Sequence, residues 1–206
     1  RRWIQPMSPV TPEPGSNWGI MGGAFNPLHF AHLRLAEMAA EAFKLSGVFF
    51  VVTDKPPHRE PPDTPFEKRF YMTGLGLEDN EAFVASDIET EIDGPGYTLR
   101  VIEALQKKYP EVNWHLLMGA DNLTIFDSWY RPEEIVELAE VCVGARPGHM
   151  EQFKKSRWAD KISKFEMPLM EISSTRIREL IKSGRSIRYL LPEKIRHYII
   201  NNKLYL

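Results

Sequence analysis

The stretch Trp18–Phe43, WGIMGGAFNPLHFAHLRLAEMAAEAF, contains a short apolar run, a pair of glycines and an amphipathic helix pattern in direct succession. This order is typical of a buried strand that enters a tight loop and then a helix. The next run, VFFVV at Val48–Val52, is apolar at every position, as in a strand that is covered on both faces. The stretch therefore predicts a βαβ unit with a right-handed crossover.

The same alternation of strand and helix patterns continues along the chain. Further strand patterns occur in EAFVASDIE, NWHLLMGAD and EVCVGA and beyond Lys161, with helix patterns between them and two final helices in SSTRIRELIKSG and PEKIRHYII. We therefore predict an α/β, Rossmann-like, doubly wound fold with a mainly parallel sheet, helices on both faces and a C-terminal helical segment. Ligands bind such sheets at the carboxyl ends of strands, so we expect the functional residues in the loops that follow strands.

The composition is that of one globular domain. The chain has 206 residues, 43% of them hydrophobic and 26% charged, with a formal net charge of -2, so it shows no bulk affinity for nucleic acid. No apolar run approaches the roughly 20 residues of a membrane span. The single cysteine, Cys142, lies in an apolar run, which predicts a buried, reduced thiol and favours a cytoplasmic location.

The chain is rich in proline near its beginning. Four prolines lie between Pro6 and Pro14, which predicts a flexible or extended arm over residues 1–16. Residues 17–206 are predicted to form a single domain.

The segment Gly22–His32, GGAFNPLHFAH, is the first motif that can carry chemistry. It matches neither the dinucleotide fingerprint nor the P-loop. His29 and His32 are three residues apart near a helix start and share a face, where free N–H groups and the helix dipole favour an anion. The alternatives are two partly buried histidines bonded to backbone carbonyls, or a zinc site. No zinc ligand set can be completed nearby, so we expect no protein-bound metal.

The segment EISSTRIREL is the second such motif. Ser173, Ser174 and Thr175 crowd a predicted helix N-terminus, and Arg176 and Arg178 follow in the first turns. Three hydroxyls, free N–H groups and guanidinium forks together suit phosphate oxygens. Taken alone, the segment could equally be an ordinary capped helix with a solvated cationic face.

Together the two motifs resemble the G-x-F-x-P-x-H-x-x-H and I-S-S-T-x-I-R patterns of the nucleotidylyltransferase superfamily. Within it the chain is similar to the bacterial nicotinate mononucleotide adenylyltransferases, and the resemblance covers about Trp18 to Leu206. It extends through DKPPHR, DIETEIDGPGYTL, LLMGADNL, DSWYRPEEI, ARPG and YIINNKLYL.

The resemblance implies that residues 17–206 are a catalytic domain that transfers the adenylyl group of ATP to nicotinate mononucleotide. The products would be nicotinic acid adenine dinucleotide and pyrophosphate, formed by direct in-line attack without a covalent enzyme intermediate. Mg²⁺ would arrive with ATP. No nucleic acid or membrane partner is implied, and the oligomeric state stays open.

Site residues are assigned by the same resemblance. The catalytic residues would be His29, His32 and Arg178, and ATP would also contact Gly22, Gly23, Ala24, Phe25, Gly119, Asp121, Ser173, Ser174 and Thr175. The acceptor would be bound by Lys55, His58, Tyr97, Thr98, Trp129, Tyr130 and Arg146. Trp129 could instead be a core residue, and Lys55 and His58 could belong to a solvated loop.

Three positions depart from the pattern of many relatives. Asn26 replaces Asp, Ala24 replaces Thr, and Ala31 replaces a Gly before the second histidine. Asn26 lacks a charge but can still form hydrogen bonds. The alternatives to nicotinate mononucleotide are a sister acceptor, nicotinamide mononucleotide or phosphopantetheine, and a nucleotide-binding module without turnover.

Overall fold

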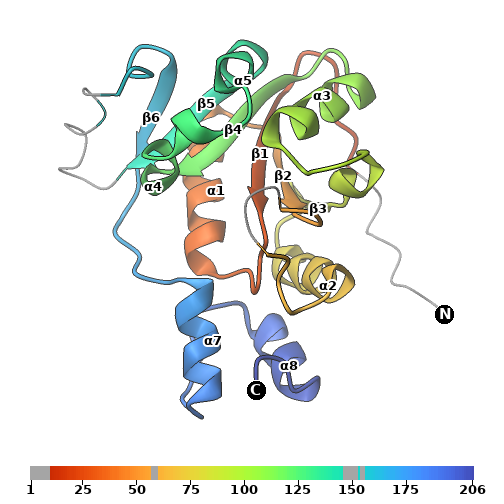
Figure 1. Cartoon of the computed structure of the whole chain (residues 1–206), viewed down its shortest axis with the longest axis vertical. Coiled ribbons are helices and arrows are strands. Elements are labelled where there is room, and N and C mark those ends of the chain that lie inside the picture. Colours follow the sequence, from red (N-terminus) through yellow and green to blue (C-terminus); the bar gives the residue numbers. More distant parts are fainter. Residues whose placement is uncertain (1–9, 57–59, 146–152, 154–155) are drawn as a thin grey trace.

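The computed structural model describes residues 10–56, 60–145, 153 and 156–206. Its centre is a six-stranded sheet with the strand order β3-β2-β1-β4-β5-β6, in which every neighbouring pair is parallel (Figure 1). The strands are β1 (Asn17–Gly23), β2 (Gly47–Val52), β3 (Phe83–Ser86), β4 (Asn113–Gly119), β5 (Glu140–Ala145) and β6 (Ile162–Glu166). This confirms the predicted fold class, a Rossmann-like α/β sheet.

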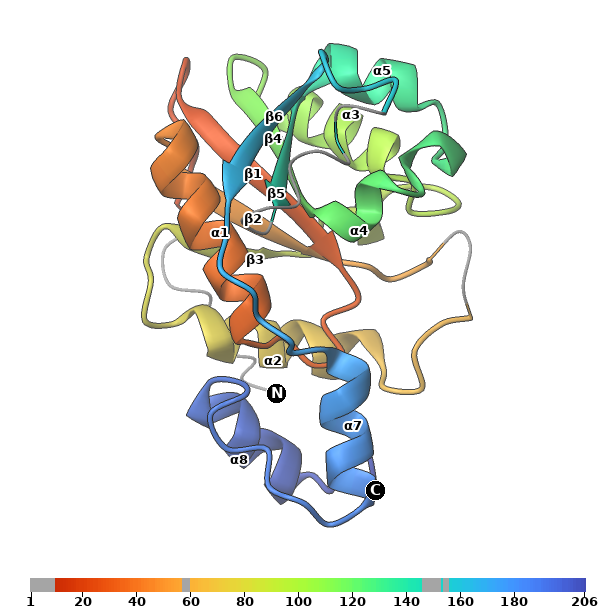
Figure 2. The same cartoon turned by 90° about the vertical axis from the view of Figure 1, so that its left-hand side faces the viewer.

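Helices follow most of the strands along the chain. In the described part of the chain, the α-helices are α1 (Phe30–Phe43), α2 (Phe66–Leu77), α3 (Thr98–Lys108), α4 (Ala120–Leu123), α5 (Pro132–Leu138), α7 (Ser174–Lys182) and α8 (Glu193–Asn201). The 3-10 helices η1 (Ile88–Glu91) and η2 (Phe126–Ser128) lie in the connections. Figures 1 and 2 show α7 and α8 below the sheet, at the end where β1 leads into α1.

The sheet separates two apolar layers. Val48, Phe50 and Val52 of β2 belong to the layer that includes residues of α1, α2, α7 and α8. Phe49 and Val51 belong to the opposite layer, with residues of α3 and α5 (Figure 2). Because successive side chains of a strand point to opposite faces, a strand in the middle of two such layers is apolar throughout.

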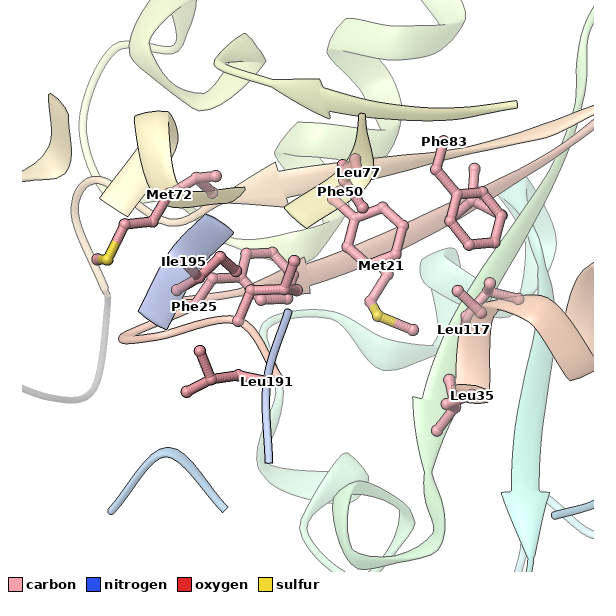
Figure 3. Packing of buried hydrophobic residues seen from close by; sticks show 14 of the residues in the cluster. Met21, Phe25, Leu35, Phe50, Met72, Leu77, Phe83, Leu117, Leu191 and Ile195 are labelled. Atoms are coloured by element: carbon pink, nitrogen blue, oxygen red, sulfur yellow. The ribbon is translucent and has the colours of Figure 1, made fainter. Parts of the chain in front are cut away.

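The first layer reaches beyond the sheet and holds the loop that follows β1. Phe25 of that loop is buried and its ring lies 5.7 Å from that of Phe50, centroid to centroid. Leu191 and Ile195, before and within α8, and Met72 of α2 belong to the same cluster (Figure 3). The loop after β1 is therefore packed between the sheet and the C-terminal helices.

One strand is shorter than its sequence pattern. The pattern predicts a strand through EAFVASDIE, but β3 ends at Ser86 and the chain turns into η1. The reason lies in Glu89, whose Oε1 accepts the backbone N–H groups of Asp54 and Lys55, each at 2.9 Å. A buried carboxylate needs such partners, and the turn supplies them.

The predicted arm is only partly described. Residues 1–9 lie outside the described residues, and Gly15 donates its N–H to the carbonyl of Glu111 at 2.7 Å. None of the helices in the described part of the chain is both long and apolar enough to cross a membrane.

Two glycines give a test of the packing around the sheet. A Cβ added at Gly47 would lie 2.5 Å from ring atoms of Trp18 and 2.6 Å from the carbonyl oxygen of Ala82, whereas one added at Gly74, within α2, would meet nothing within 4 Å. We expect Gly47→Ala to lower the free energy of unfolding by about 2 kcal/mol or more. The control Gly74→Ala should raise it by about 0.5–1 kcal/mol. Denaturant unfolding measures both, and the same sign for the two variants would contradict this packing.

Candidate active site

The loop between β1 and α1 is the centre of the candidate site. Phe25 has a left-handed backbone with φ of 42°, and its buried ring meets the ring of His32 edge-on at 5.2 Å. Asn26, Pro27 and Leu28 are also buried. The loop is thus packed on its own buried side chains where it leads into α1.

His29 and His32 stand together at this helix start. His29 is the N-cap residue, and the two rings stack at 3.7 Å between centroids with 22° between planes. The N–H of His29 lies 3.3 Å from Nδ1 of His32 and donates to it. In neutral His32 the ring proton is therefore on Nε2. Nδ1 of His29 is buried without a hydrogen-bond partner among the residues that the structure describes.

Burial keeps both imidazoles uncharged. It lowers the pKa of His29 to about 4, and it lowers the pKa of His32 to about 3 with a further contribution from the charge of His29. Desolvation penalises the imidazolium, and two stacked rings cannot both carry a positive charge cheaply. At pH 7 both imidazoles are therefore neutral, and each carries one ring N–H that can donate a hydrogen bond.

The N-terminus of α7 is hydrogen-bonded directly to this loop. Oγ of Ser174 donates to the carbonyl of Pro27 at 2.8 Å, and Nη1 of Arg178 donates to the carbonyl of Asn26 at 2.8 Å. These partners are 147 and 152 residues apart along the chain. The structure thus brings the two sequence motifs together at one place.

The first turns of α7 provide several hydrogen-bond donors at this junction. Oγ of Ser173 accepts the N–H of Arg176 at 3.1 Å and so caps α7, as the sequence predicts. Nη2 of Arg178 donates to Oγ1 of Thr175 at 3.3 Å. A guanidinium has five N–H donors, so Arg178 has others besides these and the one on Asn26. The N–H groups of Ser174 and Thr175 lie in the first turn, where no intrahelical carbonyl can accept them.

The glycines before the loop differ in their surroundings. A Cβ added at Gly22 would meet nothing within 4 Å, whereas one at Gly23 would come within 3.1 Å of the Phe25 ring. Ala24 is exposed beside them. Gly22 therefore leaves open space against the backbone, and Gly23 makes room for Phe25.

The end of β4 lies beside this loop in the sheet. β1 pairs with β2 on one side and with β4 on the other, so the strand order reverses between β1 and β4. Gly119 is the N-cap residue of α4, where an added Cβ would make only an ordinary contact with Leu35 at 3.8 Å. Asp121 is exposed in the same short helix. Both residues therefore lie at the carboxyl end of β4, next to the point of strand-order reversal at which doubly wound sheets bind ligands.

The predicted acceptor residues gather at a second place. The rings of Tyr97 and Tyr130 stack at 4.4 Å with 22° between planes, and Tyr130 is 38% exposed. Trp129 is half-buried and meets Phe126 edge-on at 5.2 Å, so it also packs against the core. Thr98 follows Tyr97 as the first residue of α3.

The backbone of the exposed Lys55 is hydrogen-bonded to the segment that contains Tyr97. Its carbonyl accepts the N–H of Gly96 at 3.1 Å, next to Tyr97. His58 and Arg146, also predicted to bind the acceptor, lie outside the described residues.

Arg69 is a site residue that the sequence analysis missed. It is 2% exposed, and its guanidinium donates to the carbonyls of Ala24 and Thr53, both at 2.8 Å, and of Thr64 at 3.0 Å. It thereby joins the loop after β1 to the segment after β2. The available signal was its spacing within FEKRFYMT, which places Arg69 on the same helical face as Phe66.

Glu89 is the second missed residue. Its carboxylate is buried, and burial raises its pKa despite the two N–H donors from Asp54 and Lys55. An added Cβ at Gly96 would overlap its Oε1. Glu89 therefore holds the segment that contains Lys55 against the segment that contains Tyr97. In the sequence it lies among several other acidic residues, so no local pattern distinguishes it.

Within the described ranges, no group of three or more His, Cys, Asp or Glu side chains could hold a metal ion.

Comparison with known proteins shows the family to which the chain belongs. The sequence model of the cytidylyltransferase-like family matches residues 20–180, which include the loop after β1 and Arg178. The chain belongs to the cytidylyltransferase-like family. Both helix N-termini of the candidate site lie inside this family match.

This cytidylyltransferase-like chain has relatives that match over nearly their whole length. It is 38% identical over 188 residues to a protein of Salinibacter ruber described as a probable nicotinate-nucleotide adenylyltransferase, covering 91% of this chain and 96% of the relative. A protein of Exiguobacterium sibiricum with the same description is 38% identical over 187 residues, with coverages of 91% and 97%. The family membership that the two motifs predict is confirmed by these matches.

Solved structures share the fold of this cytidylyltransferase-like chain. The Plasmodium falciparum nicotinic acid mononucleotide adenylyltransferase complexed with NaAD superposes with a TM-score of 0.76 at 19% identity, covering 92% of this chain and 97% of that one. A putative nicotinate-nucleotide adenylyltransferase from Vibrio parahaemolyticus gives 0.65 at 19% identity, with coverages of 89% and 99%.

The buried histidine pair makes the stability of this cytidylyltransferase-like protein depend on pH. At pH 5 both rings are neutral when folded, whereas an unfolded histidine with the ordinary pKa of 6.5 is protonated. The unfolded state then binds more protons, so the free energy of unfolding falls as the pH falls below 6.5. We expect this loss between pH 7 and pH 5 to be about 2 kcal/mol smaller in His32→Gln than in the wild type.

Urea unfolding at the two pH values measures the difference. His197→Gln, which removes an exposed histidine of α8, is the matched control. An equal effect of the two substitutions would contradict an origin in the buried pair.

Proposed function

We propose that this chain transfers the adenylyl group of ATP to nicotinate mononucleotide, giving nicotinic acid adenine dinucleotide and pyrophosphate. The observation that carries the proposal is the hydrogen-bonded junction of two helix N-termini, where Arg178 and Ser174 donate to carbonyls just before the histidine pair. Two helix starts that meet in this way suit a chain of phosphates. Relatives described as probable nicotinate-nucleotide adenylyltransferases match over nearly their full length, which supports the same reaction here.

The reaction needs no nucleophile from the protein. An oxygen of the mononucleotide 5′-phosphate attacks the α-phosphorus of ATP in line, a new phosphorus–oxygen bond forms, and the bond to the outgoing pyrophosphate breaks. Such a transfer depends on positioning and on neutralising charge. The cysteine of the chain is unsuited to attack, because Cys142 is fully buried and burial raises the pKa of its thiol far above the usual range.

Each side of the junction has a role in this transfer. His29 and His32, as neutral donors, would bond phosphate oxygens around the α-phosphorus. Arg178, with the first N–H groups of α7, would bind the pyrophosphate, and the open backbone at Gly22 would allow the triphosphate to approach. The rest of the ATP site is proposed to comprise Gly23, Ala24, Phe25, Gly119, Asp121, Ser173, Ser174 and Thr175.

We propose that Mg²⁺ enters bound to ATP and neutralises charge on the triphosphate oxygens. We also propose a cytoplasmic enzyme, since Cys142 is a buried, free thiol.

The acceptor is proposed to bind at the aromatic cluster formed by Tyr97, Trp129 and Tyr130. Trp129 is proposed to stack on the pyridine ring. The exposed part of Tyr130, which is held by its stacking on Tyr97, offers a further apolar surface beside it. Thr98, at the start of α3, offers donors for the nicotinate carboxylate. Lys55, and with it His58 and Arg146, is proposed for the mononucleotide phosphate.

The first test is pyrophosphate release with ATP and Mg²⁺ in the presence of nicotinate mononucleotide, nicotinamide mononucleotide or phosphopantetheine. We expect the nicotinate substrate to have the highest kcat/KM, with the dinucleotide product identified by mass. His29→Ala and His32→Ala should each lower kcat/KM by about 100-fold or more, because each removes a donor to the transition state. The control His197→Ala should stay within about twofold.

Normal turnover in both motif variants would refute the proposed site. Preference for another acceptor would leave the ATP chemistry standing and refute the acceptor assignment. Binding of ATP without any turnover would instead favour a nucleotide-binding module.

The acceptor cluster predicts a change confined to one substrate. Tyr130→Ala should raise KM for nicotinate mononucleotide about tenfold and leave KM for ATP within about twofold, because stacking on one ring is lost. Tyr130→Phe keeps the ring and should keep both constants near those of the wild type. Steady-state kinetics measure both, and an equal rise for ATP would contradict a separate acceptor site.

A further inference from the structure

The segment after α8 is held in an unusual backbone conformation. Lys203 and Tyr205 both have left-handed backbones, with φ of 50° and 65°. Leu204 between them is buried, and its N–H donates to the carbonyl of Ile199 at 3.0 Å. Left-handed conformations are costly for residues other than glycine and persist where surrounding contacts enforce them. The segment is therefore placed by its contacts rather than by local preference.

The contact that this conformation produces is made by the side chain of Tyr205. Its hydroxyl donates to Oδ1 of Asn26 at 2.7 Å, across 179 residues of sequence. Burial raises the pKa of Tyr205 to about 12, against the opposing effect of a hydrogen bond with the side chain of Thr64 and the nearby charges of Arg178 and Arg69. The hydroxyl thus stays protonated and remains a donor.

Asn26 receives hydrogen bonds on both of its oxygens. The side-chain oxygen accepts from Tyr205, and the backbone oxygen accepts from Arg178. The next carbonyl, of Pro27, accepts from Ser174. Asn26 is 9% exposed and stands three residues before His29. Its orientation therefore affects both the histidine pair and the arginine of the candidate site.

We propose that Tyr205 is a positioning residue for adenylyl transfer, which acts through Asn26 to hold the histidine pair and Arg178 in register with each other. This rests on the function proposed above. The hydroxyl touches neither substrate, and its effect is to remove the freedom of the Asn26 side chain and of the loop that it belongs to. Contacts to the transition state are sensitive to small displacements of the groups that make them. Loss of the hydrogen bond to Asn26 should therefore lower kcat.

The alternative is that Tyr205 only fills space beneath the loop. Its ring packs against the first apolar layer. Removal of the whole side chain would therefore destabilise this region through lost packing alone. Phenylalanine keeps the ring and deletes only the hydroxyl, with its hydrogen bonds to the side chains of Asn26 and Thr64. Tyr205→Phe is therefore the variant that separates the two roles.

The experiment compares Tyr205→Phe with Tyr198→Phe, a tyrosine of α8 whose ring contacts Tyr71. We expect Tyr205→Phe to lower kcat about tenfold, with KM for nicotinate mononucleotide within about twofold and an unchanged melting temperature within a few degrees. Tyr198→Phe should leave kcat within about twofold. A kcat within twofold of the wild type in Tyr205→Phe, or an equal loss in both variants, would overturn the proposal.

A double-mutant cycle tests the route through Asn26. In an Asn26→Ala background, Tyr205→Phe should lower kcat by less than about twofold, because the acceptor that links the hydroxyl to the loop is already gone. A further tenfold loss in that background would overturn the role of Asn26. If Asn26→Ala does not fold, Asn26→Asp takes its place. There the loss from Tyr205→Phe should exceed tenfold, since a carboxylate loses a stronger hydrogen bond. A smaller loss would overturn the proposal.

A readout without substrate separates this proposal from the proposed function. The ring signals of His29 and His32 in nuclear magnetic resonance spectra should shift in Tyr205→Phe and not in Tyr198→Phe. If the wild type transferred adenylyl to no acceptor but the signals shifted, the proposed function would fail and the positioning of the histidines by Tyr205 would stand. Unmoved signals would overturn the positioning role, whatever the activity.

Discussion

Three carbonyl oxygens in the loop between β1 and α1 accept hydrogen bonds from side chains that are far away in the sequence. Arg69 donates to Ala24, Arg178 to Asn26 and Ser174 to Pro27. A buried loop cannot satisfy its carbonyls with a neighbouring strand, and each one left unpaired would be costly. The three bonds therefore attach α2 and α7 to the end of the central strand, and the geometry of the candidate site follows from them.

The same burial that requires these bonds sets the chemistry of the histidine pair. His29 and His32 stack beneath the loop, and desolvation keeps both rings neutral. A neutral imidazole that accepts a backbone N–H on Nδ1 offers Nε2–H as a donor, as His32 does. Positive charge in the site then comes from the guanidinium of Arg178 and from the helix dipoles.

Much of the fold could be predicted from local patterns. Apolar runs such as Val48–Val52, and the capped start of α7 at Ser173, are signals within a few residues of each other. β3 was predicted to be too long, because its end depends on Glu89, which reaches a different loop. Arg69 was missed for the same reason, since its three carbonyl partners lie in separate segments. The roles of all the predicted site residues stay predictions, and His58 and Arg146 lie outside the described residues.

The sequence by itself determined the order of strands and helices, the two candidate phosphate-binding motifs and the family. They can be predicted from periodicity, capping residues and short motifs, each of which is a local property of the chain. Only the tertiary structure decided that the two motifs are hydrogen-bonded to each other, that both histidines are neutral, and that Tyr205 reaches Asn26. Those outcomes depend on burial and on contacts across 147 to 179 residues, and the free energy of such contacts is decided by packing rather than by local sequence.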